Sequence, residues 1–144
     1  MNIHATAVAL GSLGVLIEGL PGSGKTSLAL AAIEKLQSQN QFAALVADDQ
    51  CLIEAVNGKL IVTCPPALVG LVEMRGLGVV TTKSLPSVVI DLVFRLVDAD
   101  EIERMPMPEF VTMAGVELPL FELPALDIAV SLPILLQIVK DRRF

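Results

Sequence analysis

The stretch GLPGSGKTSLAL, residues 19–30, contains the pattern G-x-x-x-x-G-K-[ST] with every fixed position filled. The strand-like residues VLIEG lead into it, and a run of strong helix formers follows it. In such a strand–loop–helix unit the glycines let successive backbone N–H groups converge on phosphate oxygens, and the helix presents its positive N-terminal end. We therefore predict a nucleoside-triphosphate site formed by Gly19, Leu20, Pro21, Gly22, Ser23, Gly24, Lys25 and Thr26.

Two side chains of this loop are expected to act on the phosphates directly. Lys25 is predicted to bridge the β- and γ-phosphates, and the Thr26 hydroxyl is predicted to bind Mg²⁺. A glycine-containing turn that matches by chance would lack the flanking strand and helix, so the context favours a true phosphate site.

The rest of the chain alternates short β-prone runs with turn signals. One helical pattern directly follows the phosphate loop, and a second lies near the end of the chain. Asn57-Gly58 between two β-prone runs predicts a hairpin with a type I′ turn. Pro133 is expected either to kink the closing helix or to mark its true start. Strands are expected over residues 5–9, 15–18, 42–47 and 87–97, and helices over residues 26–37 and 128–140.

The composition indicates one acidic, apolar domain spanning residues 1–144. The net charge of −6 disfavours binding to nucleic acid or to an anionic membrane surface. No run reaches the ~18 apolar residues of a membrane span, and the N-terminus lacks the basic region of a signal peptide. We expect a cytoplasmic protein in which Cys51 and Cys64 are reduced and structural.

Paired acids follow the apolar run of residues 42–47, where a buried strand would end. Ligands of open α/β sheets lie at the carboxyl ends of strands, so Asp48 and Asp49 could face the phosphates. One carboxylate can hold Mg²⁺, directly or through water, and the other can accept a proton from an incoming hydroxyl. The alternative is an acidic turn that caps the next element.

Two further features are ambiguous when they are considered alone. The stretch Glu73–Gly78, EMRGLG, suggests a loop whose backbone passes near a ligand, but it also fits an exposed turn with a weak surface ion pair. His4 is the only histidine. A lone histidine is more often a surface or core residue than a catalyst, although its ordinary pKa suits chemistry near neutral pH.

Taken together and in order, these residues resemble the catalytic domain of HPr kinase/phosphorylase, the bacterial enzyme that phosphorylates a serine of the phosphocarrier HPr. The resemblance rests on His4-Ala5, the loop of residues 19–26, Leu45–Asp49 (LVADD) and Glu73–Gly78. It covers residues 3–80. The VADD and E-x-R-G-L-G elements together are much more specific than a phosphate loop alone.

The resemblance implies a role for each matched residue. His4 matches the active-site histidine, and the Asp48-Asp49 pair includes the general base for serine phosphorylation. Asp49 is preferred as the proton acceptor, with Asp48 as its close rival. Glu73 matches a second magnesium ligand, and the catalytic arginine of the family falls on Arg104.

The resemblance also implies an α/β fold with a twisted mixed sheet flanked by helices, like that of phosphoenolpyruvate carboxykinase. ATP and Mg²⁺ would be the cofactors, an HPr-like protein the substrate, and a hexamer the assembly. The chain starts almost at His4 and so looks like a short form without the family's N-terminal domain. A basic turn linked to dephosphorylation is replaced by Leu123–Asp127 (LPALD), which argues against phosphorylase activity.

Other functions and assemblies remain open from the sequence. A regulatory module could bind ATP without transferring phosphate. A small-molecule kinase of the adenylate-kinase type ranks last, because such enzymes use arginine-rich lids and few arginines occur here. The mean hydropathy of +0.71 suggests that a surface such as residues 132–139 is covered by another subunit. A well-filled core explains the same value nearly as well.

Overall fold

The computed structural model describes residues 1–142 and 144. Their helices and strands follow one another along the chain in the order β1 (Asn2–Ile3), β2 (Thr6–Leu10), β3 (Leu13–Gly19), α1 (Lys25–Ser38), β4 (Ala43–Ala47), β5 (Cys51–Val56), β6 (Lys59–Thr63), β7 (Leu71–Met74), β8 (Gly78–Thr81), β9 (Ser87–Ile90), β10 (Leu92–Val97), β11 (Glu109–Met113), β12 (Val116–Pro124) and α2 (Ile128–Asp141). Short 3-10 turns, η1 (Pro66–Leu68) and η2 (Ala99–Glu101), complete the path.

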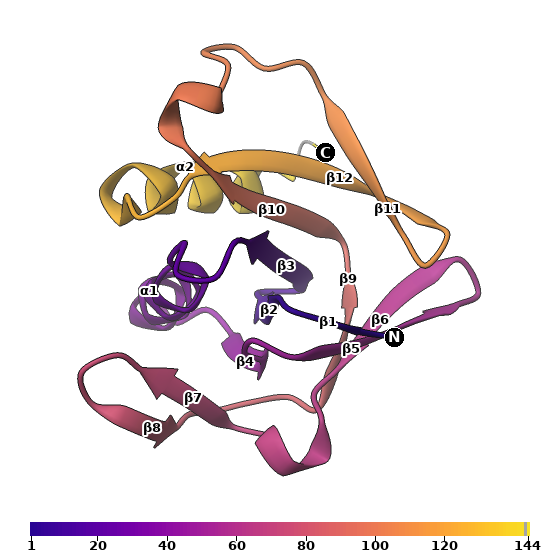
Figure 1. Ribbon diagram of the computed structural model, residues 1–144, viewed down its shortest axis with the longest axis vertical. Helices are drawn as coiled ribbons and strands as arrows, with labels where there is room; N and C mark the ends of the chain where they lie inside the picture. Colours follow the sequence, from indigo (N-terminus) through magenta and orange to yellow (C-terminus); the bar gives the residue numbers. More distant parts are fainter. Residues whose placement is uncertain (143) are drawn as a thin grey trace.

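The central element is a 6-stranded sheet in the order β11-β12-β10-β3-β2-β4. Strands β12, β10 and β3 run parallel, whereas β11, β2 and β4 pair antiparallel with their neighbours. The predicted α/β fold with a mixed sheet is therefore confirmed. Because β3 and β10 end on the same side, the phosphate loop after β3 lies beside the segment that follows β10 (Figure 1).

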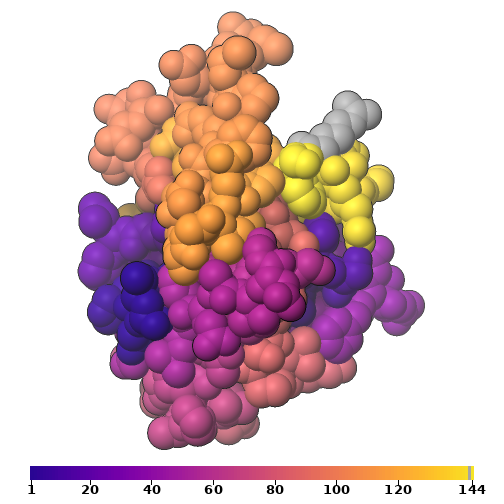
Figure 2. Space-filling model, turned by 90° about the vertical axis from the view of Figure 1, so that its right-hand side faces the viewer, coloured from indigo at the N-terminus to yellow at the C-terminus, as the bar shows by residue number. Residues whose placement is uncertain are grey.

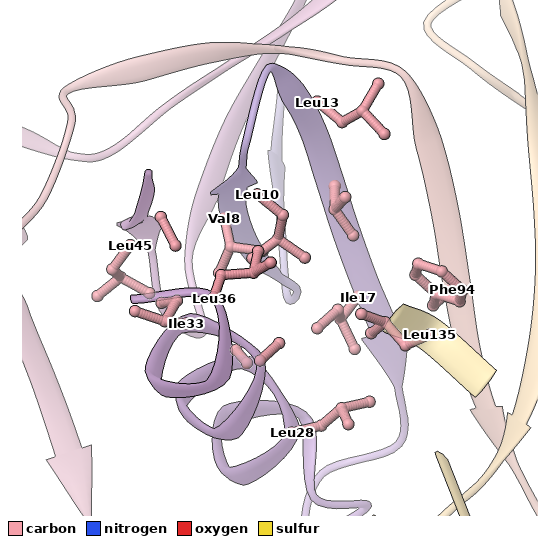
Figure 3. Close-up of a cluster of buried hydrophobic side chains, with 14 of the residues drawn as sticks. Val8, Leu10, Leu13, Ile17, Leu28, Ile33, Leu36, Leu45, Phe94 and Leu135 are labelled. Carbon is pink, nitrogen blue, oxygen red and sulfur yellow. The ribbon is translucent and has the colours of Figure 1, made fainter. Parts of the chain in front are cut away.

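Both helices pack on one face of this sheet (Figure 1). Leu28, Ile33 and Leu36 of α1 and Leu135 of α2 form one buried cluster with strand residues such as Val8, Ile17 and Phe94 (Figure 3). These side chains are at most 5% exposed. Complete burial of such a side chain contributes about 1.5–3 kcal/mol each, so this cluster fixes α1, and with it the phosphate loop, on β3.

A smaller 4-stranded sheet, in the order β1-β5-β6-β9, covers the opposite face. Leu16 and Val93 of the central sheet pack there against Leu60 and Val62 of β6. Figure 2 shows this side of the molecule, where the β5–β6 hairpin lies directly against the orange β11–β12 hairpin. The layers are therefore helices, large sheet and small sheet.

Most of the predicted elements are confirmed. Helix α1 covers the expected residues 26–37, and the β5–β6 turn has φ angles of 50° at Asn57 and 77° at Gly58, as a type I′ turn requires. Glu73–Gly78 contains the turn of the β7–β8 hairpin and the strand ends beside it, and Leu77 N–H donates there to the Met74 carbonyl at 2.9 Å.

The prediction of one strand over residues 87–97 is wrong. The segment divides into β9, which belongs to the small sheet, and β10, which belongs to the central sheet. Asp91 lies between them, where its N–H donates to the Gly14 carbonyl at 2.7 Å and its Oδ2 accepts from Gly14 N–H at 2.8 Å. Asp91 thus anchors the crossing to β3 as the chain passes from one sheet to the other.

Helix α2 begins at Ile128, so Pro133 lies inside the helix and does not mark its start. The Asp127 side chain caps the helix by accepting from Val130 N–H at 3.3 Å. Although α2 is apolar, neither it nor any other helix in the described part of the chain is long and apolar enough to cross a membrane.

Candidate active site

The phosphate loop connects the end of β3 to the start of α1, as the sequence predicts. Gly24 stands before the first helical residue with a φ of 94°, in the left-handed region that favours glycine. Its carbonyl accepts from Leu28 N–H at 3.0 Å, which begins the helical ladder. The helix therefore begins at Lys25. The N–H groups of its first turn have no partner within the helix and lie next to the loop.

The polar side chains of the loop are folded into it. Lys25 is 9% exposed, and its Nζ donates to the carbonyls of Gly19 at 2.8 Å and Leu20 at 3.2 Å. Ser23 is 7% exposed, and within the described residues its Oγ finds no hydrogen-bond partner. An unpaired buried hydroxyl beside a buried ammonium group suits a loop that binds phosphate oxygens.

The acid pair follows β4, and hydroxyl groups from two other elements fix its first member. Thr26 Oγ1 of α1 donates to Asp48 Oδ1 at 2.7 Å, and Thr6 Oγ1 of β2 donates to the same oxygen at 3.1 Å. Asp48 therefore lies next to the phosphate loop and carries an oriented carboxylate. Together, the Thr26 hydroxyl and the Asp48 carboxylate offer oxygen ligands of the kind that Mg²⁺ prefers.

The second acid is in a different environment. Asp49 has a φ of 68°, and its side chain is 72% exposed. Its Oδ1 lies 3.8 Å from His4 Nδ1, and the histidine side chain is 80% exposed. Asp49 thus faces solvent beside His4 while Asp48 faces the loop, so the structure brings together four of the residues that the sequence singled out.

A cleft of about 600 Å³ opens beside the loop, at the carboxyl ends of β3 and β10. The Glu18 carboxylate and the Arg95 guanidinium lie in its wall as an ion pair, with Nη2 at 2.6 Å and Nε at 2.7 Å from Oε1. The remaining lining comes from the N-terminal segment, the loop and the segments after β10 and β12: His4, residues 19–23, residues 96–98, Glu101, Ala125 and Leu126.

Of the predicted site residues, His4 and residues 19–23 line this cleft, and its lining does not include Gly24, Lys25, Thr26, Asp48, Asp49, Glu73 or Arg104. The last two also lie apart from the loop and the acid pair. Glu73 is exposed on β7, opposite Val79 of β8, in a hairpin that packs on the helix side of the core through Val72. Arg104 is exposed in the segment after η2, which arches over the top of the molecule in Figure 1. Within the described residues, no three His, Cys, Asp or Glu side chains cluster as a metal site.

The turn that differs from the family pattern lies directly on the phosphate loop. Leu126 N–H donates to the Ser23 carbonyl at 3.1 Å, and Ala125 N–H donates to the Val97 carbonyl at 2.7 Å. Leu126 itself has a φ of 56° and is 76% exposed. An apolar side chain therefore stands where the resemblance led us to expect basic ones.

The two cysteines are free and buried, in agreement with their expected structural role. Burial, followed by the nearby Cys64, Asp48 and Asp49, raises the pKa of the Cys51 thiol to about 12. Burial also raises the pKa of Cys64. Both thiols therefore remain protonated and poorly nucleophilic near neutral pH.

Sequence reasoning missed Thr6 and the Glu18–Arg95 pair. A lone hydroxyl in the otherwise apolar run TAVAL, residues 6–10, was one available signal. The ion pair had no local signal, because Glu18 and Arg95 are 77 positions apart and meet only through the β3–β10 register.

A family model described as the HPr Serine kinase C-terminal domain matches residues 1–134. This chain belongs to that family. The match extends well beyond residues 3–80, over which the resemblance was recognised, and it includes β10, β12 and the first half of α2.

Curated relatives named HPr kinase/phosphorylase agree with this assignment. The protein from Clostridium beijerinckii is 31% identical over 134 residues, which cover 85% of this chain and 42% of the relative. The protein from Chlorobium phaeobacteroides is 31% identical over 133 residues, which cover 84% of this chain and 38% of the relative. The chain thus spans less than half the length of these relatives.

A solved structure described as the Hpr(Ser) kinase/phosphatase from Coxiella burnetii has the same fold. The match has a TM-score of 0.82 at 22% identity and covers 99% of this chain and 96% of that chain. At this identity the likeness establishes the fold, namely the mixed sheet with two helices, and it leaves the chemistry to be argued from the site.

Proposed function

We propose that residues 1–144 form one catalytic domain that transfers the γ-phosphoryl group of ATP to a serine of an HPr-like phosphocarrier in the cytoplasm. The observation that carries the proposal is the hydrogen bond from Thr26 to Asp48, because it joins the phosphate loop to the acid pair. Family membership supports the proposed substrate class and kinase activity.

The phosphates of ATP would bind backbone N–H groups of the loop of residues 19–26, in which Pro21 has none to donate, with Lys25 on the β- and γ-phosphates. The buried, unpaired Ser23 hydroxyl and the buried Lys25 ammonium fit that role. Thr26 and Asp48 would hold Mg²⁺, which when bound neutralises charge on the phosphate oxygens. Glu73 is proposed as a further magnesium ligand on the resemblance, and the β7–β8 hairpin would have to approach the loop for it to act.

The acceptor serine would enter from the exposed side of Asp49. A bond forms between the serine oxygen and the γ-phosphorus while the bond from that phosphorus to the β–γ bridging oxygen breaks, and ADP leaves. The serine proton passes to the Asp49 carboxylate, which is exposed and not held by the loop. His4, 3.8 Å away, would orient that carboxylate, and Arg104 would neutralise charge on the transferring group.

Reverse transfer to inorganic phosphate is not expected to be efficient. The turn of residues 124–127 that contacts the loop carries no basic side chain, and its Asp127 adds a negative charge. A free phosphate ion would find less positive charge beside the loop than a basic turn provides. We therefore propose a kinase with weak phosphorylase activity.

The test is to incubate the purified protein with γ-labelled ATP, Mg²⁺ and an HPr-type phosphocarrier. We expect acid-stable phosphate on the carrier serine, no label on a carrier with that serine replaced by alanine, and no label without Mg²⁺. ATP binding without any transfer would contradict the proposal. That result would favour the second candidate, a nucleotide-binding regulatory module, which the intact loop also permits.

A further inference from the structure

The cleft beside the phosphate loop contains one permanent positive charge among its described lining residues, that of Arg95. The other ionisable groups there are His4 and the carboxylates of Glu18, Asp98 and Glu101. A surface with three carboxylates repels phosphate oxygens unless a cation is placed among them. Arg95 is therefore the group that decides whether this wall of the cleft accepts an anion.

The position of Arg95 is fixed by the sheet. Arg95 pairs with Glu18 in the parallel β3–β10 register, and the next pair along is Leu96 with Gly19, the first residue of the loop. The guanidinium thus projects from the wall one residue before the phosphate loop begins. It points to the face opposite the helices, where His4 also borders the cleft.

Glu18 holds the guanidinium by one edge. A single carboxylate oxygen, Oε1, accepts from Nε at 2.7 Å and lies 2.6 Å from Nη2. A guanidinium has five N–H donors in a planar fork, so several remain directed away from Glu18. The Arg95 side chain is 37% exposed, so these donors face the cleft and not the core.

We propose that Arg95, held in place by Glu18, binds the γ-phosphate of the nucleotide. Phosphoryl transfer spreads negative charge over the γ-phosphate oxygens, and an arginine supplied from the same chain is a recognised way to stabilise that charge. Arg95 meets this need from the rigid sheet, whereas Arg104 lies in the exposed segment after η2. The inference rests only on the nucleotide-binding part of the proposed function.

The test compares the binding of two nucleotides by calorimetry in the presence of Mg²⁺. A non-hydrolysable ATP analogue carries the γ-phosphate, and ADP does not. Arg95→Met is expected to weaken binding of the analogue about tenfold or more, the usual effect of one lost charge-assisted hydrogen bond, and to change ADP binding less than about twofold. Arg95→Lys should fall between Arg95→Met and the wild type. Lys59→Met, which removes a charge from the exposed first residue of β6, should change neither affinity.

Glu18→Gln separates binding by Arg95 from positioning by Glu18. The amide keeps the length of the side chain and an acceptor oxygen, so the analogue should bind more weakly than to the wild type but more tightly than to Arg95→Met. ADP affinity should not change. Circular dichroism of each variant verifies that the fold is kept, since the pair also joins two strands.

The inference is overturned if Arg95→Met weakens both nucleotides equally, if it weakens neither, or if the wild type binds no nucleotide. Its failure is distinguishable from that of the proposed kinase activity. If the protein phosphorylates the carrier serine and Arg95→Met leaves both nucleotide affinities unchanged, only the inference about Arg95 is refuted. If Arg95→Met loses affinity for the analogue alone but the wild type phosphorylates no carrier, only the kinase proposal is refuted.

Discussion

At the scale of single residues, the two adjacent acids have different surroundings. Asp48 accepts hydrogen bonds from Thr26 and Thr6, whereas Asp49 is exposed beside His4. A carboxylate tied to the loop suits metal binding, and a free one suits proton transfer. This contrast favours Asp49 as the base, the choice that the sequence alone left open.

The acid pair gives the first prediction. Asp49→Asn should lower kcat by about 10²–10⁴-fold, the usual contribution of a general base, and leave the Mg²⁺ requirement unchanged. Asp48→Asn should instead raise the Mg²⁺ concentration needed for half-maximal transfer. Steady-state kinetics over a range of Mg²⁺ concentrations measures both effects. A lower kcat in Asp48→Asn and a raised Mg²⁺ requirement in Asp49→Asn would show that Asp48 is the base and Asp49 the metal ligand.

Thr6 gives a second prediction. Thr6→Val keeps the shape of a fully buried side chain but removes its hydrogen bond to Asp48. The free energy of unfolding should fall by about 1 kcal/mol in urea titrations, and the Mg²⁺ requirement should rise. Thr112→Val, at an exposed position of β11, is the matched control and should change neither quantity. An unaltered Mg²⁺ requirement in Thr6→Val would show that Thr6 supports only the fold.

The buried thiols give a third prediction. Burial raises the pKa of the Cys51 thiol from 9.0 to about 12, so very little of it is ionised at pH 8. Thiolate-directed reagents should therefore label Cys51 only as fast as the protein opens. Labelling followed by peptide mass mapping, with and without urea, measures this. Rapid reaction of Cys51 in the folded protein would contradict its burial.

The residues of the site differ in how well the sequence alone predicts them. The loop and the acid pair were predictable because each is a local pattern with its own chemistry. Thr6 and the Glu18–Arg95 pair were not, because their contacts depend on how β2 pairs with β4 and how β3 pairs with β10. Such registers join residues far apart in the chain, and no local spacing encodes them.

At the scale of secondary structure, the helices and hairpins were the most predictable elements. The run after Lys25 has strong helix formers, and Asn57-Gly58 selects its turn. The division of residues 87–97 was not predictable from hydrophobicity, because β9 and β10 both consist mainly of apolar residues. Asp91, between the two apolar stretches, was the residue that could have marked the division, and in the structure it bonds to Gly14.

The start of α2 gives the fourth prediction. Asp127→Ala removes the side chain that accepts from Val130 N–H and should cost about 0.5–2 kcal/mol of unfolding free energy. Asp141→Ala removes the same charge from the last turn, where an acid is unfavourable to the helix dipole, and should change stability by less than about 0.5 kcal/mol. Equal losses in thermal denaturation would show that the cap contributes nothing.

At the scale of the whole molecule, α2 leaves apolar side chains uncovered. Val130 and Ile134 are more than two-fifths exposed, whereas Leu135 of the same helix is fully buried. We propose that this outer face meets another copy of the chain, and the hexamer implied by the resemblance is the expected assembly.

Light scattering at micromolar concentration should give a mass above that of the monomer. Ile134→Glu should lower the mass, and the control Gln39→Glu, at the exposed end of α1, should not. A monomeric wild type would contradict the proposal.

The phosphate loop after β3 and the segments that follow β4 and β10 lie at one end of the central sheet, and the acid pair and the charged cleft belong to these segments. The loop lysine lies inside this site, with its Nζ on the Gly19 and Leu20 carbonyls. It is therefore the residue whose removal should affect phosphate transfer most directly while leaving the packing of α1 on the sheet in place.

The measurement that tests the central claim most directly is the mass of an HPr-type carrier after incubation with Mg²⁺, ATP and either the wild type or Lys25→Ala. We predict that the wild type adds one phosphate to the carrier serine and that Lys25→Ala, with its folding verified by circular dichroism, adds none. Full transfer by Lys25→Ala, or none by the wild type, would contradict the account.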